Sequence, residues 1–284
     1  MSKLLTALLP PALGSDNVCP ESFYAGKIAL LPPSALSLNV VRVLQQALQQ
    51  ALFPAPDIAT AHRVLDGNYL RERLHRLRIR LYSDQVVLQN LAQIIQELAN
   101  EWGWPELPYV DLPRLRAIVP NMHQLPAAAD AFSAHRDTWY ANPPAQINLW
   151  IPLGDYPAQQ TFVFYPDYFC KPVANDSADF DYEQWRADVG WQSLRRPDRS
   201  VYPQALETLK STQLGFACEA GQRLLFSGSH LHQPLPNQSQ HIRYSLDLRL
   251  VCPADHQLMR GAPQVDNGSR GSTWSEFVPL ATWQ

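Results

Sequence analysis

The spacing of the hydrophobic residues changes about one third of the way along the chain. Before that point they recur at helical intervals, from Leu36 to Leu52 and again from Ser83, a suitable N-cap, to Gly103. After Pro105, short runs of β-branched and aromatic residues follow, separated by proline and glycine. These runs are LRAIVP, QINLWIPL, TFVFYP, QRLLFSG and IRYSLDLRLV. Helices followed by strands, without alternation, predict an α+β fold: an antiparallel barrel or jelly roll with helices on one side.

Two of the expected strands have clearly separated faces. In each, alternate residues are apolar and the residues between them are mostly polar. The polar sets are Arg243, Ser245, Asp247 and Arg249 in one strand, and Gln146 and Asn148, with Trp150, in the other. These faces meet solvent, or they line the lumen of the barrel while the apolar faces pack against the helices. The pattern leaves both interpretations open.

A long stretch, residues 167–211, interrupts the series of strands. It is rich in Asp, Tyr, Trp and Pro, which predicts loops and short helices that form a lid over the mouth of the barrel. We therefore expect one domain, 1–284. It would comprise a mainly helical part (1–110), a jelly-roll core (111–251) that carries the lid insertion, and a C-terminal extension (252–284).

Composition narrows the class of protein. With 284 residues, 46% hydrophobic and 17% charged, the chain can bury a large core, and its net charge of -3 gives no basic surface for nucleic acid. The four cysteines form no CxxC pair, which favours free thiols. The opening MSKLLTALLPPALG is a short apolar run broken by proline, which we interpret as part of the mature protein. No segment approaches the ~20 apolar residues of a membrane helix. We expect a cytoplasmic protein without a membrane partner. The sequence does not indicate its oligomeric state.

Candidate metal ligands lie in two places. In AHRDTWY, an extended strand would project His135 and Asp137 to the same side, where an imidazole and a carboxylate can share one ion. This signal is weak alone, but GSHLHQP downstream offers His230 or His232 as a third ligand, and spacing does not decide between them. Two histidines and one carboxylate are the facial set of oxygen-activating iron enzymes.

A candidate anchor for a carboxylate follows on the returning strand. Arg243 comes eleven residues after His232, and its planar guanidinium can hold a carboxylate through two parallel hydrogen bonds. Ser245 lies on the same face of that strand and adds a further donor.

Together these residues resemble a known family. The order HxD, a long gap, then His-x4-Asn-x5-Arg-x-Ser is similar to the iron(II)/2-oxoglutarate oxygenases, particularly their phytanoyl-CoA dioxygenase-like branch. The matching residues are His135, Asp137, His232, Asn237, Arg243 and Ser245, and the similarity extends from about Gly26 to Val251.

The resemblance implies a double-stranded β-helix, with Fe(II) bound by His135, Asp137 and His232 instead of His230. It implies that 2-oxoglutarate and O2 are cosubstrates, with Arg243 binding the far carboxylate of 2-oxoglutarate. Related halogenases replace the carboxylate ligand with a small residue, so Asp137 favours hydroxylation, or a desaturating or ring-forming variant.

The substrate is harder to predict. Polar and aromatic residues around the ligands suggest a small, polar metabolite, and Asn148 is placed to reach 2-oxoglutarate. Candidate substrate contacts are Arg116, Trp139, Gln146, Trp150 and Phe169. As a whole the sequence resembles cyanobacterial natural-product oxygenases, such as those of cylindrospermopsin biosynthesis, which implies a late tailoring step in the formation of an alkaloid toxin. Two rival interpretations are a cupin-like metalloenzyme that does not use 2-oxoglutarate and an inactive metal-binding sensor.

Overall fold

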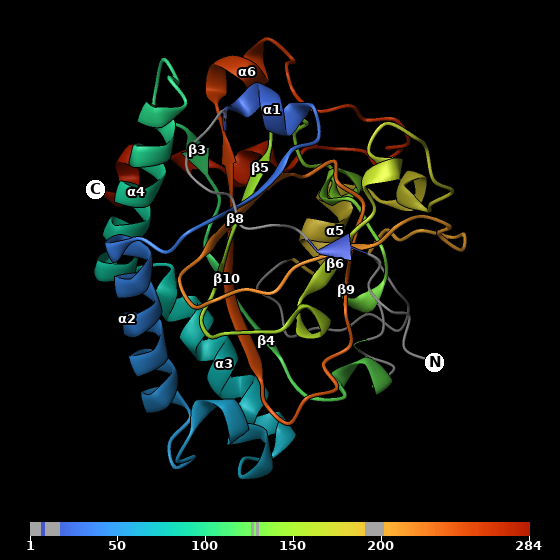
Figure 1. Cartoon of the computed structure of the whole chain (residues 1–284). Coiled ribbons are helices and arrows are strands. Elements are labelled where there is room, and N and C mark those ends of the chain that lie inside the picture. Colours follow the sequence, from blue (N-terminus) through green and yellow to red (C-terminus); the bar gives the residue numbers. More distant parts are fainter. Residues whose placement is uncertain (1–6, 9–17, 126–127, 129–130, 191–201) are drawn as a thin grey trace.

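The computed structural model describes residues 7–8, 18–125, 128, 131–190 and 202–284. Its longer helices come early and its longer strands later (Figure 1). The helices are α1 Pro20–Tyr24, α2 Ala35–Ala51, α3 Gly67–Leu81, α4 Gln85–Glu101, α5 Tyr182–Asp188 and α6 Pro253–Gln257. The strands are β1 Ala7–Leu8, β2 Ile28–Leu31, β3 Tyr109–Val110, β4 Arg114–Ile118, β5 Ile147–Pro152, β6 Phe162–Phe164, β7 Leu214–Gly215, β8 Arg223–Ser227, β9 His232–Pro234, β10 Arg243–Val251 and β11 Val278–Pro279.

The helical spacing in the first third correctly predicted α2 and α4. Helix α2 begins after Ser34, whose side chain accepts a hydrogen bond from the Ser37 amide at 3.2 Å. The N-cap of α4 is Asp84 instead of the expected Ser83, because it is the Asp84 carboxylate that accepts from the Val87 amide. Gly103, with a positive φ of 66°, ends that helix as expected. The sequence pattern did not indicate α3 or β2.

The strands form two mainly antiparallel sheets. In the large sheet the order is β11-β3-β10-β5-β8-β2, and β4 also pairs with β10. The small sheet has the order β1-β7-β6-β9, in which the pairing of β1 with β7 is parallel. The α+β class and the five expected strands are confirmed, whereas the assignment to a double-stranded β-helix stays a prediction.

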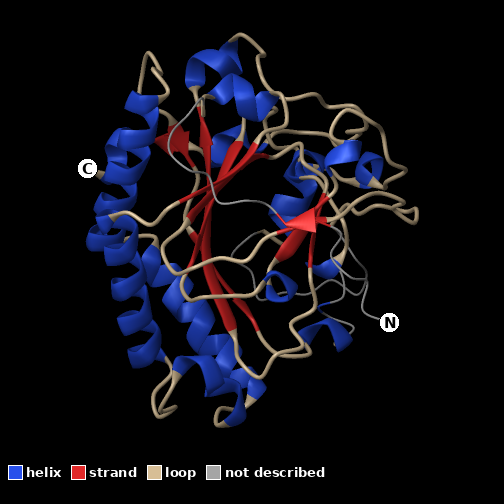
Figure 2. Ribbon diagram, in the orientation of Figure 1, coloured by secondary structure: helices blue, strands red, loops and turns tan. Residues whose placement is uncertain are grey.

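The large sheet buries both of its faces. Helices α2, α3 and α4 lie along one face (Figure 2), where their leucines form a single core with the apolar side of β5 and β10. That side consists of Ile147, Leu149 and Ile151 together with Tyr244, Leu246, Leu248 and Leu250. The other face looks toward the small sheet, and there Trp150 packs with Phe162, Phe164 and Phe216. The polar faces of β5 and β10 therefore line the interior, and among their polar residues only Asp247 is partly exposed.

The segment between β6 and β7 contains α5 and short 3-10 helices, as expected for residues 167–211, of which 191–201 lie outside the described residues. The C-terminal extension is integrated into the fold, because β11 adds to the large sheet through β3. Most of the opening segment interpreted as mature protein also lies outside the described residues. In the described part of the chain, no helix has the length and apolar character needed to cross a bilayer.

Candidate metal centre

Three potential metal ligands converge inside the fold. One ligand atom from each of His135, Asp137 and His232 can be chosen so that all lie within 4.8 Å of one another. His135 and His232 face each other across an isolated antiparallel bridge, in which both backbone N–H···O bonds are 3.0 Å. This pairing explains why two histidines almost a hundred residues apart have ring centroids separated by 4.4 Å.

The expected strand through His135 and Asp137 is only partly correct. Arg136 has extended torsions, φ -108° and ψ 141°, so its two neighbours project to the same side as predicted. Asp137, however, is the first residue of a 3-10 helix, η4 (Asp137–Tyr140), because the chain turns there and leaves the bridge.

Each histidine is oriented by its own backbone. The Nδ1 atom of His135 lies 3.0 Å from the Ser133 carbonyl, and that of His232 lies 3.0 Å from the His230 carbonyl. A carbonyl partner requires a proton on Nδ1, which leaves Nε2 as the metal-binding atom. Both Nε2 atoms face Oδ1 of Asp137, at 3.8 Å from His135 and 4.0 Å from His232.

The second carboxylate oxygen of Asp137 is held by two amides. Its Oδ2 accepts hydrogen bonds from Asn148 Nδ2 at 2.6 Å and from Gln146 Nε2 at 3.2 Å, and Gln146 Nε2 also lies 2.7 Å from Asn148 Oδ1. Gly228 leaves room for this arrangement, since a Cβ there would lie 2.8 Å from Gln146 Nε2. Only Oδ1 remains directed at the two imidazoles.

The surroundings place Asp137 and His135 in the protonation states that a metal requires. Burial raises the pKa of Asp137, but Arg249, the two histidines and the Asn148 hydrogen bond outweigh it and lower that pKa to about 2. Burial and the neighbouring His232 lower the pKa of His135 to about 4. At neutral pH the site therefore offers a carboxylate and a neutral His135 imidazole without prior deprotonation.

Arg243 and Ser245 present buried polar atoms to the interior. Nη1 of Arg243 donates to the carbonyls of Gln160 and Thr161, both at 2.8 Å. Its Nε and the hydroxyl of Ser245 are buried and have no hydrogen-bond partner among the described residues. Burial lowers the pKa of the Arg243 guanidinium to about 10, so it is still a cation at neutral pH. Unpaired buried donors on one strand face fit an anionic oxygen ligand.

His230 is not part of the metal cluster. Its side chain is fully buried, with the Phe169 ring 4.5 Å and the Phe164 ring 5.5 Å away between centroids. Burial, above all, lowers the pKa of His230 to about 3. The structure thus groups His232, and not His230, with His135 and Asp137, which is the choice that the family resemblance favoured.

The expected substrate and cosubstrate residues occupy different environments. Asn148 and Gln146 hold Asp137 and face the interior. Trp150 lies in the same interior, edge-on to Phe162 and Phe216. Arg116, with a half-exposed side chain, forms an ion pair with Asp247 at 3.0 Å at the edge of this face.

Two other candidates are engaged elsewhere. Trp139 is fully buried and donates its indole N–H to Asp266 at 2.9 Å, and Phe169 packs on His230. These contacts give both side chains a packing role in the wall of the site.

Two important groups were missed by sequence reasoning. Arg249 was visible only as one member of a polar strand face, and it pairs with Asp111 at 3.0 Å beside the Asp137 carboxylate. Asp266 carried no signal at all, because it lies in a loop of the C-terminal extension far from any motif. Tyr140 is a third neighbour, with its ring 5.4 Å from that of His135.

No protein-family model and no curated protein matches the sequence. Among solved structures, EvdO2 from Micromonospora carbonacea var. aurantiaca in complex with 2-oxoglutarate is 13% identical, with 86% of this chain and 94% of that chain covered and a TM-score of 0.49.

The epimerase SnoN from nogalamycin biosynthesis, in complex with Fe3+, alpha ketoglutarate and nogalamycin RO, is 15% identical, covering 92% of this chain and 98% of its own, with a TM-score of 0.42. AviO1 from Streptomyces viridochromogenes Tue57 is 17% identical, with 83% and 94% covered and a TM-score of 0.41. At these identities and TM-scores, the likeness to these structures assigns no function to this chain.

Proposed function

We propose that this protein is an iron(II)- and 2-oxoglutarate-dependent oxygenase that hydroxylates a small, polar metabolite in a late step of natural-product biosynthesis. The observation that carries the proposal is one interior face with two features. It holds a converging His-Asp-His set, and nearby on β10 it holds a buried arginine and serine with unpaired donor atoms.

The donor set fits iron(II) well. Two imidazole nitrogens and one carboxylate oxygen on one side of an ion leave the opposite coordination positions open for other ligands. Bound iron would supply oxygen activation, with 2-oxoglutarate as the source of electrons. The chain's own part is to keep Asp137 anionic, to fix both imidazoles through Nδ1, and to hold one carboxylate oxygen away from the ion through Asn148 and Gln146.

Arg243 and Ser245 would bind the distal carboxylate of 2-oxoglutarate. Nη1 of Arg243 is fixed by two backbone carbonyls, so the plane of its guanidinium is preorganised while Nε stays available. A metalloenzyme without this cosubstrate would gain nothing from a buried, incompletely paired arginine, which costs free energy unless an anion completes its hydrogen bonds.

The first experiment is anaerobic binding. Purified protein with iron(II) and 2-oxoglutarate under nitrogen should develop the weak visible charge-transfer band of the chelate. The alanine variants of His135, Asp137 and His232 should lose both the band and turnover. His230→Ala is the matched control, since His230 shares the segment but not the cluster, and it should retain the band. Loss of the band in His230→Ala, but not in His232→Ala, would contradict the ligand assignment.

A second experiment addresses the substrate. Candidate metabolites are screened by mass spectrometry for the gain of one oxygen atom, coupled to release of one succinate. The overall resemblance to cylindrospermopsin-forming oxygenases makes the deoxy precursor of that alkaloid the first compound to test. Metal binding without any response to 2-oxoglutarate would indicate a cupin-like metalloenzyme or an inactive sensor instead.

A further inference from the structure

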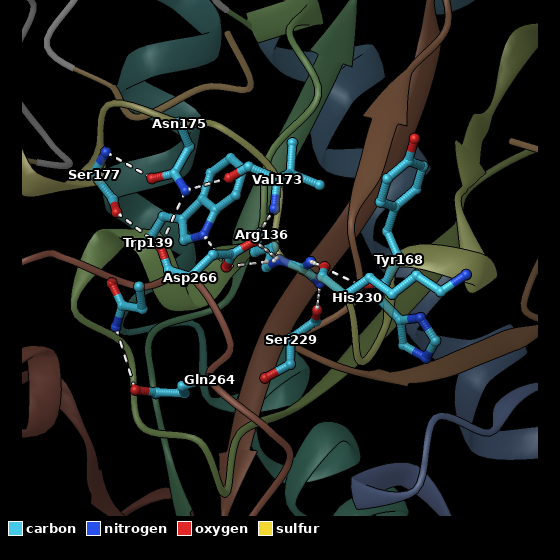
Figure 3. Close-up of polar contacts among 12 residues, drawn as sticks. Arg136, Trp139, Tyr168, Val173, Asn175, Ser177, Ser229, His230, Gln264 and Asp266 are labelled. Atoms are coloured by element: carbon cyan, nitrogen blue, oxygen red, sulfur yellow. Dashed lines mark hydrogen bonds and ion pairs between the residues drawn. The ribbon is translucent and has the colours of Figure 1, made fainter. Parts of the chain in front are cut away.

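The residue between the two ligands of the HxD motif has a role of its own. The side chain of Arg136 is only 1% exposed, and it points away from the metal cluster into the wall of the site. Nη1 donates to the Ser229 carbonyl at 2.6 Å, and Nη2 donates to the carbonyls of Tyr168 and Lys171 at 2.7 and 2.9 Å. One guanidinium thus connects residues 134–144, which carry His135 and Asp137 and are called the ligand segment, to the start of the 167–211 insertion and to the turn before His232 (Figure 3).

The partner of this guanidinium comes from the C-terminal extension. Asp266, with a side chain 4% exposed, lies 3.1 Å from Nε of Arg136. The same carboxylate accepts the indole N–H of Trp139 and the backbone N–H of Val173, both at 2.9 Å. Asp266 therefore binds residues on both sides of Asp137 and one residue of the insertion (Figure 3).

The C-terminal extension reaches the ligand segment at two more points. Thr273 donates its backbone N–H to the Ala141 carbonyl at 3.0 Å and its hydroxyl to Oδ1 of Asn142 at 2.7 Å. The Asn142 side chain in turn donates to the Asp137 carbonyl at 2.7 Å. Ala262 donates to the Pro144 carbonyl at 2.9 Å. Residues Ala262, Asp266 and Thr273 thus contact the 136–144 segment at both of its ends and in its middle.

We infer that Asp266 and Arg136 form a positioning pair for the proposed metal site, so that the C-terminal extension holds His135 and Asp137 in register with His232. The inference rests on the proposed function, because it assigns a purpose to that site's wall. Neither residue touches a ligand atom. They act through the backbone, since a side chain fixed at four points fixes the torsions that aim its two neighbours at one ion.

The pair also fixes the insertion to the same point. Tyr168, Lys171 and Val173 all bind Arg136 or Asp266, and Phe169 between them packs on His230. A change in the geometry of the ligands is therefore transmitted to the start of the insertion, and the reverse also holds. This linkage provides a readout that does not depend on catalysis.

The test uses the whole protein and manganese(II), which binds the same donor types as iron(II) without reacting with oxygen. Asp266→Asn keeps the shape of the side chain but removes the charge that pairs with Arg136. We expect it to raise the Kd of manganese(II) about 10-fold, which is in the range found when residues that orient metal ligands are changed. It should also change the electron paramagnetic resonance spectrum of the bound ion and speed hydrogen exchange at the Val173 amide, which donates to Asp266.

The matched control is Arg270→Gln. Arg270 also joins the extension to the insertion, through Asp181 at 3.3 Å, but its side chain is 63% exposed and it does not contact the ligand segment. This variant should leave the manganese Kd and spectrum unchanged. An Asp266→Asn protein that is folded in a thermal melt, yet binds manganese with the wild-type Kd and spectrum, overturns the inference.

A measurement on the wild type keeps the inference falsifiable if the variant does not fold. Manganese(II) should slow hydrogen exchange at the amides of Val173, Ala262 and Thr273, because these amides bond to the pair or to the ligand segment. Unchanged exchange at all three, in protein that binds manganese, also overturns it. If the wild type does not bind manganese at all, the proposed metal site itself is wrong.

Discussion

At the scale of single residues, the site is defined by how each polar atom is used. Oδ2 of Asp137 is occupied by two amides, whereas Oδ1 faces the imidazoles. In the proposed metal site this division would make Asp137 a one-oxygen ligand with a fixed direction, set by two amides that are not themselves ligands. The two interior arginines also differ in how their donors are used. Arg249 binds Asp111, whereas Nε of Arg243 has no hydrogen-bond partner among the described residues.

Asn148→Ala should weaken metal binding without removing a ligand. It deletes the 2.6 Å hydrogen bond to Asp137, which frees the carboxylate to rotate. We expect the manganese(II) Kd to rise about 10- to 100-fold. Isothermal titration of the variant and of Asn39→Ala checks this; Asn39 bonds to Asn90 on the distant helices, so its loss should not affect the metal. Equal affinity in both variants would show that Gln146 alone orients Asp137.

Arg243 should act on the cosubstrate and not on the metal. Arg243→Lys retains a charge but not the planar fork, so we expect the KM for 2-oxoglutarate to rise by the equivalent of ~1.5–3 kcal/mol, the range for hydrogen bonds to charged groups. Manganese(II) affinity measured without 2-oxoglutarate should stay at the wild-type value and serves as the internal control. An unchanged KM in Arg243→Ala would remove the main support for a 2-oxoglutarate enzyme.

At the scale of elements, the alternation of apolar and polar residues correctly predicted which residues of a strand share a face. Alternation along β5 and β10 gave their two faces because both faces are buried against different layers, one of leucines and one of polar and aromatic groups. The same pattern could not say that the polar layer was interior, since alternation is identical for a solvated face. Asp137 lies in a 3-10 helix because its conformation depends on the tertiary fold: Asn142 donates to the Asp137 carbonyl, and the Asn142 side chain is held by the hydroxyl of the distant Thr273.

The insertion at residues 167–211 is the element whose motion we predict. Both of its ends are fastened to the ligand segment, by Arg136 near Tyr168 and by the Ala205 amide, which donates to the Ala134 carbonyl at 2.9 Å. Occupancy of the metal site should therefore change how readily the insertion opens. Trypsin should cut it quickly in metal-free protein, and manganese(II) with 2-oxoglutarate should protect it. The same cleavage rate in both states would identify a packed subdomain that does not move.

At the scale of the whole molecule, sequence reasoning predicted the α+β class and the convergence of His135, Asp137 and His232, but not what surrounds them. Ligands are recoverable because a metal restricts their chemistry and spacing. The residues around the cluster cannot be predicted in this way. Asp266, Thr273 and Arg249 are common residue types, and only the tertiary fold determines which residues they contact. For the same reason the sequence did not show that the C-terminal extension adds β11 to the large sheet and hydrogen-bonds to residues 141–144.

The buried thiol of Cys218 links the stability of the whole fold to pH. All four cysteines are free thiols; Cys170 is exposed, whereas Cys218 is buried near Tyr156. Burial raises the pKa of the Cys218 thiol to about 12 from an ordinary value of about 9. Between these two values the unfolded chain has released the proton and the folded chain has not. The stability that this thiol contributes is thus fully present below pH 9 and is lost as pH rises toward 12.

Raising the pH from 8 to 10 should therefore remove on the order of 1 kcal/mol of unfolding free energy through Cys218. Urea unfolding at the two pH values measures the difference, and Cys218→Ala should show a drop smaller by about that amount. The variant loses buried volume and is less stable at both pH values, so the comparison is between the two drops and not between absolute stabilities. Cys170→Ala is the control for the loss of a thiol from the exposed surface. Equal drops in the wild type and Cys218→Ala would show that the native fold admits water to Cys218, and the interior between the sheets would then be less closed than its packing indicates.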